Sequence, residues 1–182
     1  RKKNIQNNFT YKRWNNINKK KMDKKLIFFL ALLFSINVFS QNIPQVPELV
    51  TLDKIRLKIN EDARNEIQIE VDALHANAKY FNAIIDKINI YFPVIEKILE
   101  EENVPTDFKY LSLQESSLIP DAISSSNAVG FWQFKSTTAK TYGLNINNLV
   151  DERRNVVSST RAAAKYLKNS NFVFDNWIFS LL

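Results

Sequence analysis

The stretch that decides the fold and the candidate site is residues 115–144, which read ESSLIPDAISSSNAVGFWQFKSTTAKTYGL. It opens with Glu115, at the end of an apolar helical run that contains Phe108 and Leu111. A serine-rich loop follows, and then an aromatic run over residues 131–134 that contains one amide, Gln133. Apolar surroundings disfavour the charged form of a carboxyl group, which is how proteins make a general acid. The stretch therefore predicts a single acid at the edge of a loop.

The only two glycines of the chain, Gly130 and Gly143, both lie in this stretch. Glycine reaches backbone conformations with positive φ that other residues avoid, so its concentration here predicts a loop with a fixed path. Gly143 follows a short helix expected over residues 137–142, with Ser136 as its cap. Asn127 suits a left-handed turn, because asparagine tolerates that conformation better than most residues.

Upstream of this stretch the apolar residues recur every three or four positions over residues 65–90, which predicts a helix. Pro93 suits the first turn of a second helix that reaches about Glu102. The acid run of residues 100–102 is expected to be a solvated face. Thr106 with Asp107 offers an N-cap for the helix that carries Glu115.

Downstream, residues 151–155 lead into a helix that reaches about Lys168, and Asp175 is expected to cap a last helix near Trp177. The residues of the first of these helices that are expected to face inward are Ala162, Ala163, Tyr166 and Leu167. No segment reads as a persuasive strand. The predicted fold class is therefore all-α.

The charge of the chain is unevenly distributed. Residues 1–40 hold ten Lys or Arg and one acid, Asp23, so residues 41–182 have a net charge of −3 although the whole chain has +6. The body of the chain has no cationic surplus, and nucleic-acid binding is not expected. The chain has no cysteine and one histidine, His75, which we expect on a helix at or near the surface. We expect no metal and no cofactor.

Residues 22–40 read as a signal peptide that begins at Met22. Lys24 and Lys25 precede an apolar run over residues 26–34, which is too short for a membrane span, and cleavage would fall before Gln41. The alternative is a membrane-surface anchor or a structured N-terminal arm. We expect export to the periplasm or cell envelope, with membrane contact only through this segment.

The expected organisation is residues 1–21 as upstream sequence, 22–40 as signal peptide, 41–64 as linker and 65–182 as one domain, with its motif core at 106–182.

The string of residues resembles the lytic transglycosylase domain of the soluble-lytic-transglycosylase type. The positions that match the family pattern are Glu115, Ser116, Pro120, Ala122, Ser124, Ala128, Gly130, Trp132, Gln133, Phe134 and Thr138. The similarity continues in Tyr142-Gly143-Leu144, in residues 150–154 and 160–163, and in Asp175-Asn176-Trp177.

The resemblance implies a lysozyme-like helical domain that binds peptidoglycan strands and cleaves the MurNAc–GlcNAc β-1,4 bond with formation of 1,6-anhydroMurNAc. Glu115 matches the single catalytic acid. Ser124 and Gln133 match residues near the substrate, and Ser116 matches a serine that orients the loop. Gly130 and Trp132 are also candidate substrate-binding residues, although packing beneath the loop is the stronger expectation for Trp132.

The resemblance stops at Leu182, where the family continues with an Ala-Tyr-Asn-x-Gly motif. We therefore expect a truncated domain that exposes apolar surface at Trp177 and at the apolar residues of 178–182. We also expect poor solubility and little activity from this chain alone.

Three other functions stay open at this point. A goose-type lysozyme-like hydrolase would share the fold and the acid but release a reducing sugar. A non-catalytic peptidoglycan-binding module would bind without cleavage, and a secreted helical domain would do neither. The sequence does not indicate the oligomeric state.

Overall fold

The computed structural model describes residues 24, 27–28, 30–31, 43–52, 55–174 and 177. Its core elements are the helices α3 (Glu61–Ala76), α4 (Ala78–Glu101), α5 (Lys109–Ser116), α6 (Ser136–Thr141) and α7 (Val156–Phe174). Two 3-10 turns, η1 (Thr106–Phe108) and η2 (Glu152–Arg154), precede α5 and α7. The predicted helical fold class is confirmed.

A small β-hairpin that the sequence reading did not predict precedes the helices. Its strands β1 (Leu49–Leu52) and β2 (Ile55–Lys58) are antiparallel, with Leu49 opposite Lys58. Val50 is buried on one strand, and Ile59 is buried directly after the other. The linker predicted over residues 41–64 is therefore wrong for this segment, whose apolar residues alternate with the period of a strand.

The helix predicted over residues 65–90 is in fact interrupted, and α4 does not begin at Pro93. Asn60 caps α3 by accepting a hydrogen bond from the Ala63 amide at 2.8 Å. Asn77 ends α3 and caps α4 by accepting from the Tyr80 amide at 3.0 Å. Pro93 lies inside α4 on its exposed side. Proline removes one backbone hydrogen bond, but burial of the opposite face keeps the helix continuous. The buried residues of α4 are Ile84, Ile88, Phe92, Ile95, Ile98 and Leu99.

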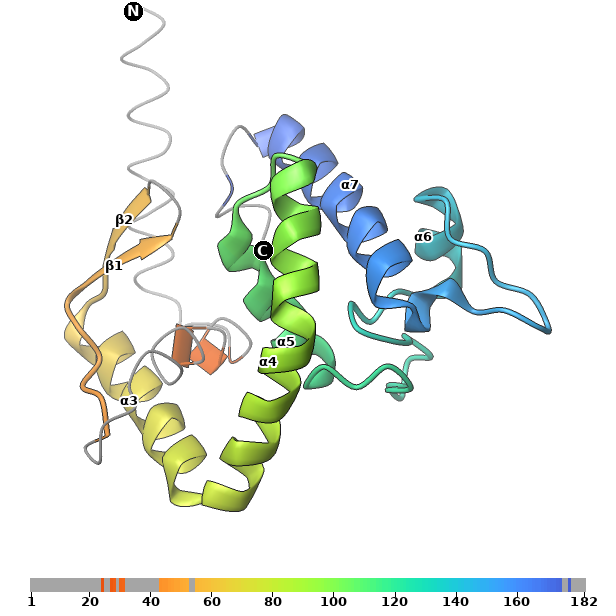
Figure 1. Cartoon of the computed structure of the whole chain (residues 1–182). Coiled ribbons are helices and arrows are strands. Elements are labelled where there is room, and N and C mark those ends of the chain that lie inside the picture. The colour runs from red at the N-terminus through yellow and green to blue at the C-terminus, as the bar shows by residue number, and fades with distance from the viewer. Residues whose placement is uncertain are drawn as a thin grey trace, which may run out of the picture.

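The helix α4 is the central element of the fold, with α3 at one side and α7 across the other (Figure 1). Three consecutive alanines of α7, residues 162–164, are buried and allow α7 to lie close to α4. The interior therefore lies mainly between these long helices.

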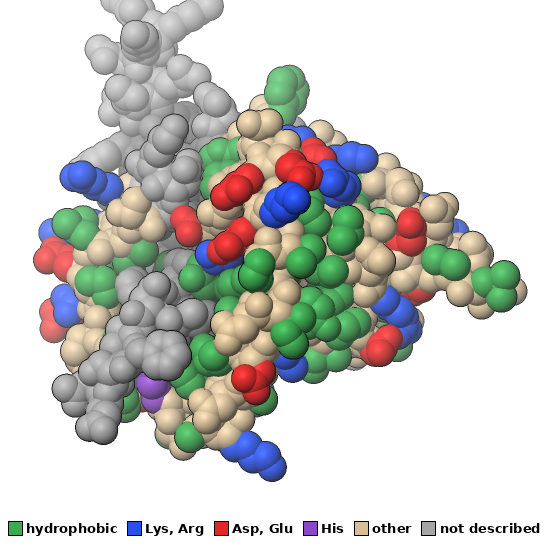
Figure 2. Space-filling view, viewed as in Figure 1, with side chains coloured by type: hydrophobic (Ala, Val, Ile, Leu, Met, Phe, Trp, Pro, Cys, Tyr) green, Lys and Arg blue, Asp and Glu red, His purple; other side chains and the backbone are tan. Residues whose placement is uncertain are grey.

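Ion pairs link the last turn of α4 to α7, so residues 100–102 are not simply a solvated face. Arg161 Nη2 lies 2.8 Å from Glu101 Oε2, and Lys168 Nζ lies 2.6 Å from Glu102 Oε2. The hydrogen bond from Lys168 is the main cause that lowers the pKa of Glu102. Figure 2 shows acidic and basic side chains gathered near the upper end of α4.

The C-terminal part of the described chain differs from the predicted structure in two ways. The helix α7 continues to Phe174 instead of ending near Lys168. Trp177 is not exposed, because its ring packs edge-on against Phe108 with centroids 5.5 Å apart. Asp175, the expected cap of the predicted last helix, and residues 178–182 lie outside the described residues.

The predicted signal peptide lies mostly outside the described residues. Of its described positions, residues 24, 27, 28, 30 and 31 are helical, and Ile27, Leu30 and Ala31 are buried in the hydrophobic core. Within the part of the chain that the structure describes, no helix combines the length and the hydropathy that a membrane crossing needs.

Candidate active site

Glu115 lies in the last turn of α5, half-buried beside the apolar face of that helix. Phe108 and Leu113 are almost fully buried and anchor the helix in the core. The predicted N-cap by Thr106 and Asp107 does not form, because these residues belong to η1 and make no capping hydrogen bond to α5. Hydrophobic anchoring, not capping, therefore fixes the start of this short helix.

The end of α5 is held by a left-handed residue and by α4. Ser117 has φ +50°, and its amide donates to the Leu113 carbonyl at 2.7 Å. Lys87 Nζ of α4 donates to the Ser117 carbonyl at 3.1 Å. The following residue, Leu118, also has positive φ and is completely buried. These contacts set the direction in which the chain leaves α5, directly after Glu115.

Glu115 lines a groove with a volume of about 540 Å³. The groove is formed by α5, the loop after it, the start of α6 and one face of α7. Its lining residues are Leu111, Glu115, Ser124, Ser126, Ala128, Trp132, Gln133, Phe134, Lys135, Thr138, Ala163, Tyr166 and Leu167. Among these described residues Glu115 is the only acid and Lys135 the only base. The groove therefore offers one carboxyl group.

Ser124 is the centre of a tight turn in the wall of this groove. Its amide donates to the Ala128 carbonyl at 2.9 Å, and its hydroxyl accepts from the Ala128 amide at 3.1 Å. Its oxygen also lies 3.1 Å from the Ser126 hydroxyl oxygen. Asn127 has φ +61°, which confirms the left-handed turn expected there. The turn holds Ser124 toward the groove.

Gln133 also lines the groove, and its side chain folds back on the loop. Its Nε2 donates to the Gly130 carbonyl at 3.0 Å and to the Ala122 carbonyl at 3.2 Å. Because both amide hydrogens are engaged in this way, the carbonyl oxygen of the side chain is the group left to accept a hydrogen bond from a ligand.

Trp132 packs beneath the loop, as expected from the sequence. It is 9% exposed, and its indole N–H donates to the Thr160 hydroxyl on α7 at 3.0 Å. Only a small part of the ring reaches the groove. Its main role is to fasten the loop to α7.

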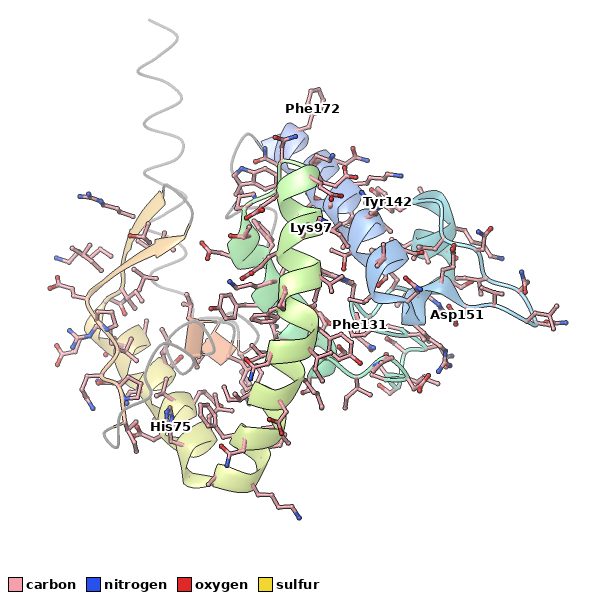
Figure 3. The ribbon with its side chains drawn as sticks, in the orientation of Figure 1. His75, Lys97, Phe131, Tyr142, Asp151 and Phe172 are labelled. Atoms are coloured by element: carbon pink, nitrogen blue, oxygen red, sulfur yellow. The ribbon has the colours of Figure 1, made fainter. Side chains whose placement is uncertain are left out.

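Ser116 and Gly130 are not among the groove-lining residues. The Ser116 hydroxyl is buried and lies 3.0 Å from the Ser112 carbonyl and 3.1 Å from the Phe131 carbonyl, so its hydrogen is shared between them. The second contact joins the end of α5 to the aromatic run. Figure 3 shows Phe131 beside the lower part of α4, where it lies edge-on to Tyr91 with centroids 4.9 Å apart.

Gly130 has φ +83° and lies against the backbone of η2. Its amide donates to the Ala122 carbonyl at 2.9 Å. A Cβ at this position would meet the Arg153 carbonyl oxygen at 1.9 Å, so no side chain fits. Gly143 has φ +88° after α6, with open space around it, as expected for a helix end. The predicted cap by Ser136 is wrong, because Ser136 is the first residue of α6 and Lys135 occupies the cap position without a side-chain hydrogen bond.

Arg153 is a buried residue that supports the loop of the site, and it was not among the predicted site residues. Its guanidinium makes a two-pronged ion pair with Asp151, through Nε at 2.8 Å and Nη2 at 2.7 Å. Its Nη1 donates to the Phe134 carbonyl at 3.1 Å. The hydrogen bond from Arg153 holds the pKa of Asp151 below its ordinary value. The signal available in the sequence was a basic residue two positions after an acid.

Tyr166 was expected to face inward but is 42% exposed and lines the groove. It lies on α7 with Ala163 and Leu167, which are buried as expected. Periodicity places all three on one helix face, but it does not tell which residue of that face borders an open groove.

His75 is a part-buried helix residue far from this groove, as expected. Its Nδ1 lies 2.8 Å from the Val71 carbonyl, and its ring lies 4.8 Å from that of Phe81. Figure 3 places it on α3, at the other side of α4 from the loop. Among the described residues, no group of three or more His, Cys, Asp or Glu side chains could hold a metal ion.

Comparison with known proteins gives consistent matches. The family model of the transglycosylase SLT domain matches residues 92–182. Membrane-bound lytic murein transglycosylase D of Escherichia coli (strain K12) is 30% identical over 130 residues, which cover 71% of this chain and 28% of that protein. The protein of the same name from Escherichia coli O6:H1 gives the same values. A putative tributyltin chloride resistance protein of Alteromonas sp. (strain M-1) is 33% identical over 86 residues, which cover 47% of this chain and 41% of that protein.

The chain thus spans less than a third of the length of the Escherichia coli relatives it matches. The matched region contains α5, the serine turn, the aromatic run and α7, which together form the groove. On the extent of this match, the chain belongs to the transglycosylase SLT domain family.

Proposed function

We propose that this chain is the catalytic part of a peptidoglycan lytic transglycosylase in which Glu115 is the single general acid and base. The observation that carries the proposal is the position of Glu115 as the one acid among the described residues that line the groove. The names of the Escherichia coli relatives support a murein glycan as the substrate.

Glu115 would first donate its proton to the glycosidic oxygen, which is GlcNAc O4. The bond between this oxygen and MurNAc C1 would then break. Its carboxylate would then accept the proton of the MurNAc 6-hydroxyl as O6 bonds to C1, which closes the 1,6-anhydro ring. The proton returns to Glu115, and no water is consumed. Most glycosidases need a second carboxylate for the opposite face of the sugar. Here the N-acetyl group of the substrate would cover that face, consistent with one acid.

Ser124 and Gln133 are the proposed polar contacts to the substrate. Both line the groove, and the side-chain oxygen of Gln133 is available to accept a hydrogen bond from an N-acetyl or hydroxyl group. Trp132, Ser116 and Gly130 would act through the position of the loop, because they are buried and fastened to their neighbours.

The test is digestion of purified murein sacculi by the full chain and by its Glu115→Gln variant, with mass spectrometry of the products. Because little activity is expected of this chain alone, we expect a low yield of products that end in 1,6-anhydroMurNAc, and a rate lower by about a hundredfold or more in Glu115→Gln. Glu100→Gln is the matched control, because Glu100 is exposed on α4 and does not line the groove.

Two outcomes would contradict the proposal in different ways. Products one water heavier, with a reducing end, would assign the chain to the goose-type lysozyme-like hydrolases. Murein binding by the unchanged chain without any product would assign it to non-catalytic binding modules.

We also propose that residues 22–40 direct export to the cell envelope. The proposal is supported by the basic start and the apolar run of this segment. Expression in a bacterial host and N-terminal sequencing of the exported protein should give Gln41 as the first residue. Recovery of the intact N-terminus on an exported and folded protein would support the structured-arm alternative.

A further inference from the structure

Tyr166 is the largest apolar side chain that α7 presents to the groove. It is 42% exposed, whereas Ala163 and Leu167, its neighbours on the same helix face, are almost fully buried. A half-exposed aromatic ring in a groove leaves apolar area that a bound ligand can cover.

The ring of Tyr166 is braced from two sides by other aromatic rings. Tyr142 lies edge-on at 5.5 Å between centroids, with an interplanar angle of 75°. Phe134 lies edge-on at 6.4 Å with an angle of 80°. These are the geometries in which aromatic pairs attract each other. Tyr166 is therefore held in place before any ligand arrives.

Tyr142 is itself fixed between α6 and α7, as Figure 3 shows. Its hydroxyl accepts a hydrogen bond from Asn169 Nδ2 at 3.4 Å, one turn after Tyr166 on α7. Bracing of this kind lowers the entropy lost when a ligand immobilises a side chain.

The polar groups of the groove come from other segments. Glu115 belongs to α5, and Ser124 and Gln133 belong to the loop, whereas α7 contributes only carbon surface and the Tyr166 hydroxyl. A ligand that contacts both α7 and the polar segments of the groove needs an apolar face and a rim of hydroxyl or amide groups. A pyranose ring has this form, with its C–H bonds on one face and its hydroxyls around the edge.

We propose that Tyr166 is a stacking platform for one pyranose ring of the glycan strand and contributes to its affinity through the aromatic face. This inference rests on the proposed function, because it names a contact to the same substrate in the same groove. It adds a residue that the sequence pattern had assigned to the interior.

The test measures binding of a peptide-free tetrasaccharide of alternating GlcNAc and MurNAc by isothermal titration calorimetry. All variants are made in the Glu115→Gln background, so that cleavage does not consume the ligand. Tyr166→Ala should bind about tenfold more weakly, the size expected for loss of one aromatic contact and its covered area. Tyr166→Phe keeps the aromatic face and should stay within about twofold of the parent.

Phe172→Ala is the matched control, because Phe172 is an aromatic residue of the same helix that is 89% exposed and does not line the groove. Its affinity should equal that of the parent. Circular dichroism checks the fold of each variant, and Tyr166→Leu, which keeps apolar volume without a ring, replaces Tyr166→Ala if the latter unfolds. Tyr166→Leu is expected to lose as much affinity for the tetrasaccharide as Tyr166→Ala.

Equal affinity of the parent and of Tyr166→Ala or Tyr166→Leu would overturn the inference. A loss in Tyr166→Phe as large as in Tyr166→Ala would also overturn it, because the hydroxyl and not the face would then be the contact. If the unmutated chain releases anhydro products but Tyr166 does not affect binding, only this inference fails. If binding depends on Tyr166 but no product forms, the proposed cleavage fails and the platform stands.

Discussion

Gly130 packs so closely against Arg153 that a β-carbon at position 130 would lie 1.9 Å from the Arg153 carbonyl oxygen. The two residues belong to the loop of the groove and to the turn before α7, and their contact is made by backbone atoms. Backbone atoms cannot rotate away as a side chain can. The loop therefore depends on the absence of a side chain at this position.

Gly130→Ala should lower the free energy of unfolding by about 3 kcal/mol or more, because the new methyl group must displace backbone at a residue that also has positive φ. Gly143→Ala is the matched control, since it has φ +88° but nothing within 4 Å of the added carbon. It should cost only about 1 kcal/mol. Urea unfolding measures both values. Equal losses would mean that the close contact with Arg153 is unimportant.

Asp151→Asn should remove about 3 kcal/mol of stability, because it leaves the buried Arg153 guanidinium without its carboxylate. The lowered pKa of Asp151 also predicts a pH dependence. The stabilisation is complete above the unfolded pKa of 3.8 and is lost as pH falls below that value through the lower folded pKa. Thermal unfolding of the variant should therefore lose part of its acid sensitivity.

Asp121→Asn is the control for that experiment, because Asp121 pairs with Arg154 but its side chain is 77% exposed. Its effect should stay within about 1 kcal/mol, as for other exposed ion pairs. A loss as large as that of Asp151→Asn would show that burial does not distinguish the two pairs.

Ser116→Ala should slow the proposed cleavage and destabilise the protein by about 1–3 kcal/mol, because the Phe131 carbonyl loses its buried donor. Ser125→Ala, at an exposed position of the loop, should change neither quantity. Rates on murein and urea unfolding are measured on the same preparations. Unchanged rates in Ser116→Ala would show that the Ser116 hydroxyl does not help to position Glu115.

Tyr110 should ionise at higher pH in the folded protein than in the unfolded chain. Burial, with the charges of Asp107 and Glu96, raises the pKa of Tyr110 to about 12. The folded state keeps its proton where the unfolded state loses it, so stability falls as pH rises from the unfolded pKa of 10.0 toward 12. Tyrosinate absorbance in a pH titration should lose its step at about pH 12 in Tyr110→Phe. An unchanged titration curve would contradict the assignment.

Several features near the groove were predicted correctly because their signals are local, although the helix caps expected at Thr106–Asp107 and at Ser136 do not form. Gly143 ends α6, Asn127 takes the left-handed turn, and Trp132 packs beneath the loop. The first two outcomes follow from the backbone freedom of glycine and asparagine, and the third follows from the large aromatic ring of Trp132. Glu115 was also placed correctly at the end of its helix, next to the groove.

The errors concern properties that depend on distant parts of the chain. Pro93 is accommodated inside α4 because the opposite face of that helix is buried against other elements, which periodicity alone does not show. Tyr166 borders open space because the elements around it form a groove there. The β-hairpin needed two short strands to be recognised as partners, and each strand has only four residues.

The loop between α5 and α6 is fastened to three neighbours, through Ser116 to α5, through Arg153 to η2 and through Thr160 to α7. We therefore expect a ligand that enters the groove to meet a wall that already has its final shape. Free and saccharide-bound forms should superpose closely along this wall, and inhibitors can be designed against the empty protein as a rigid template.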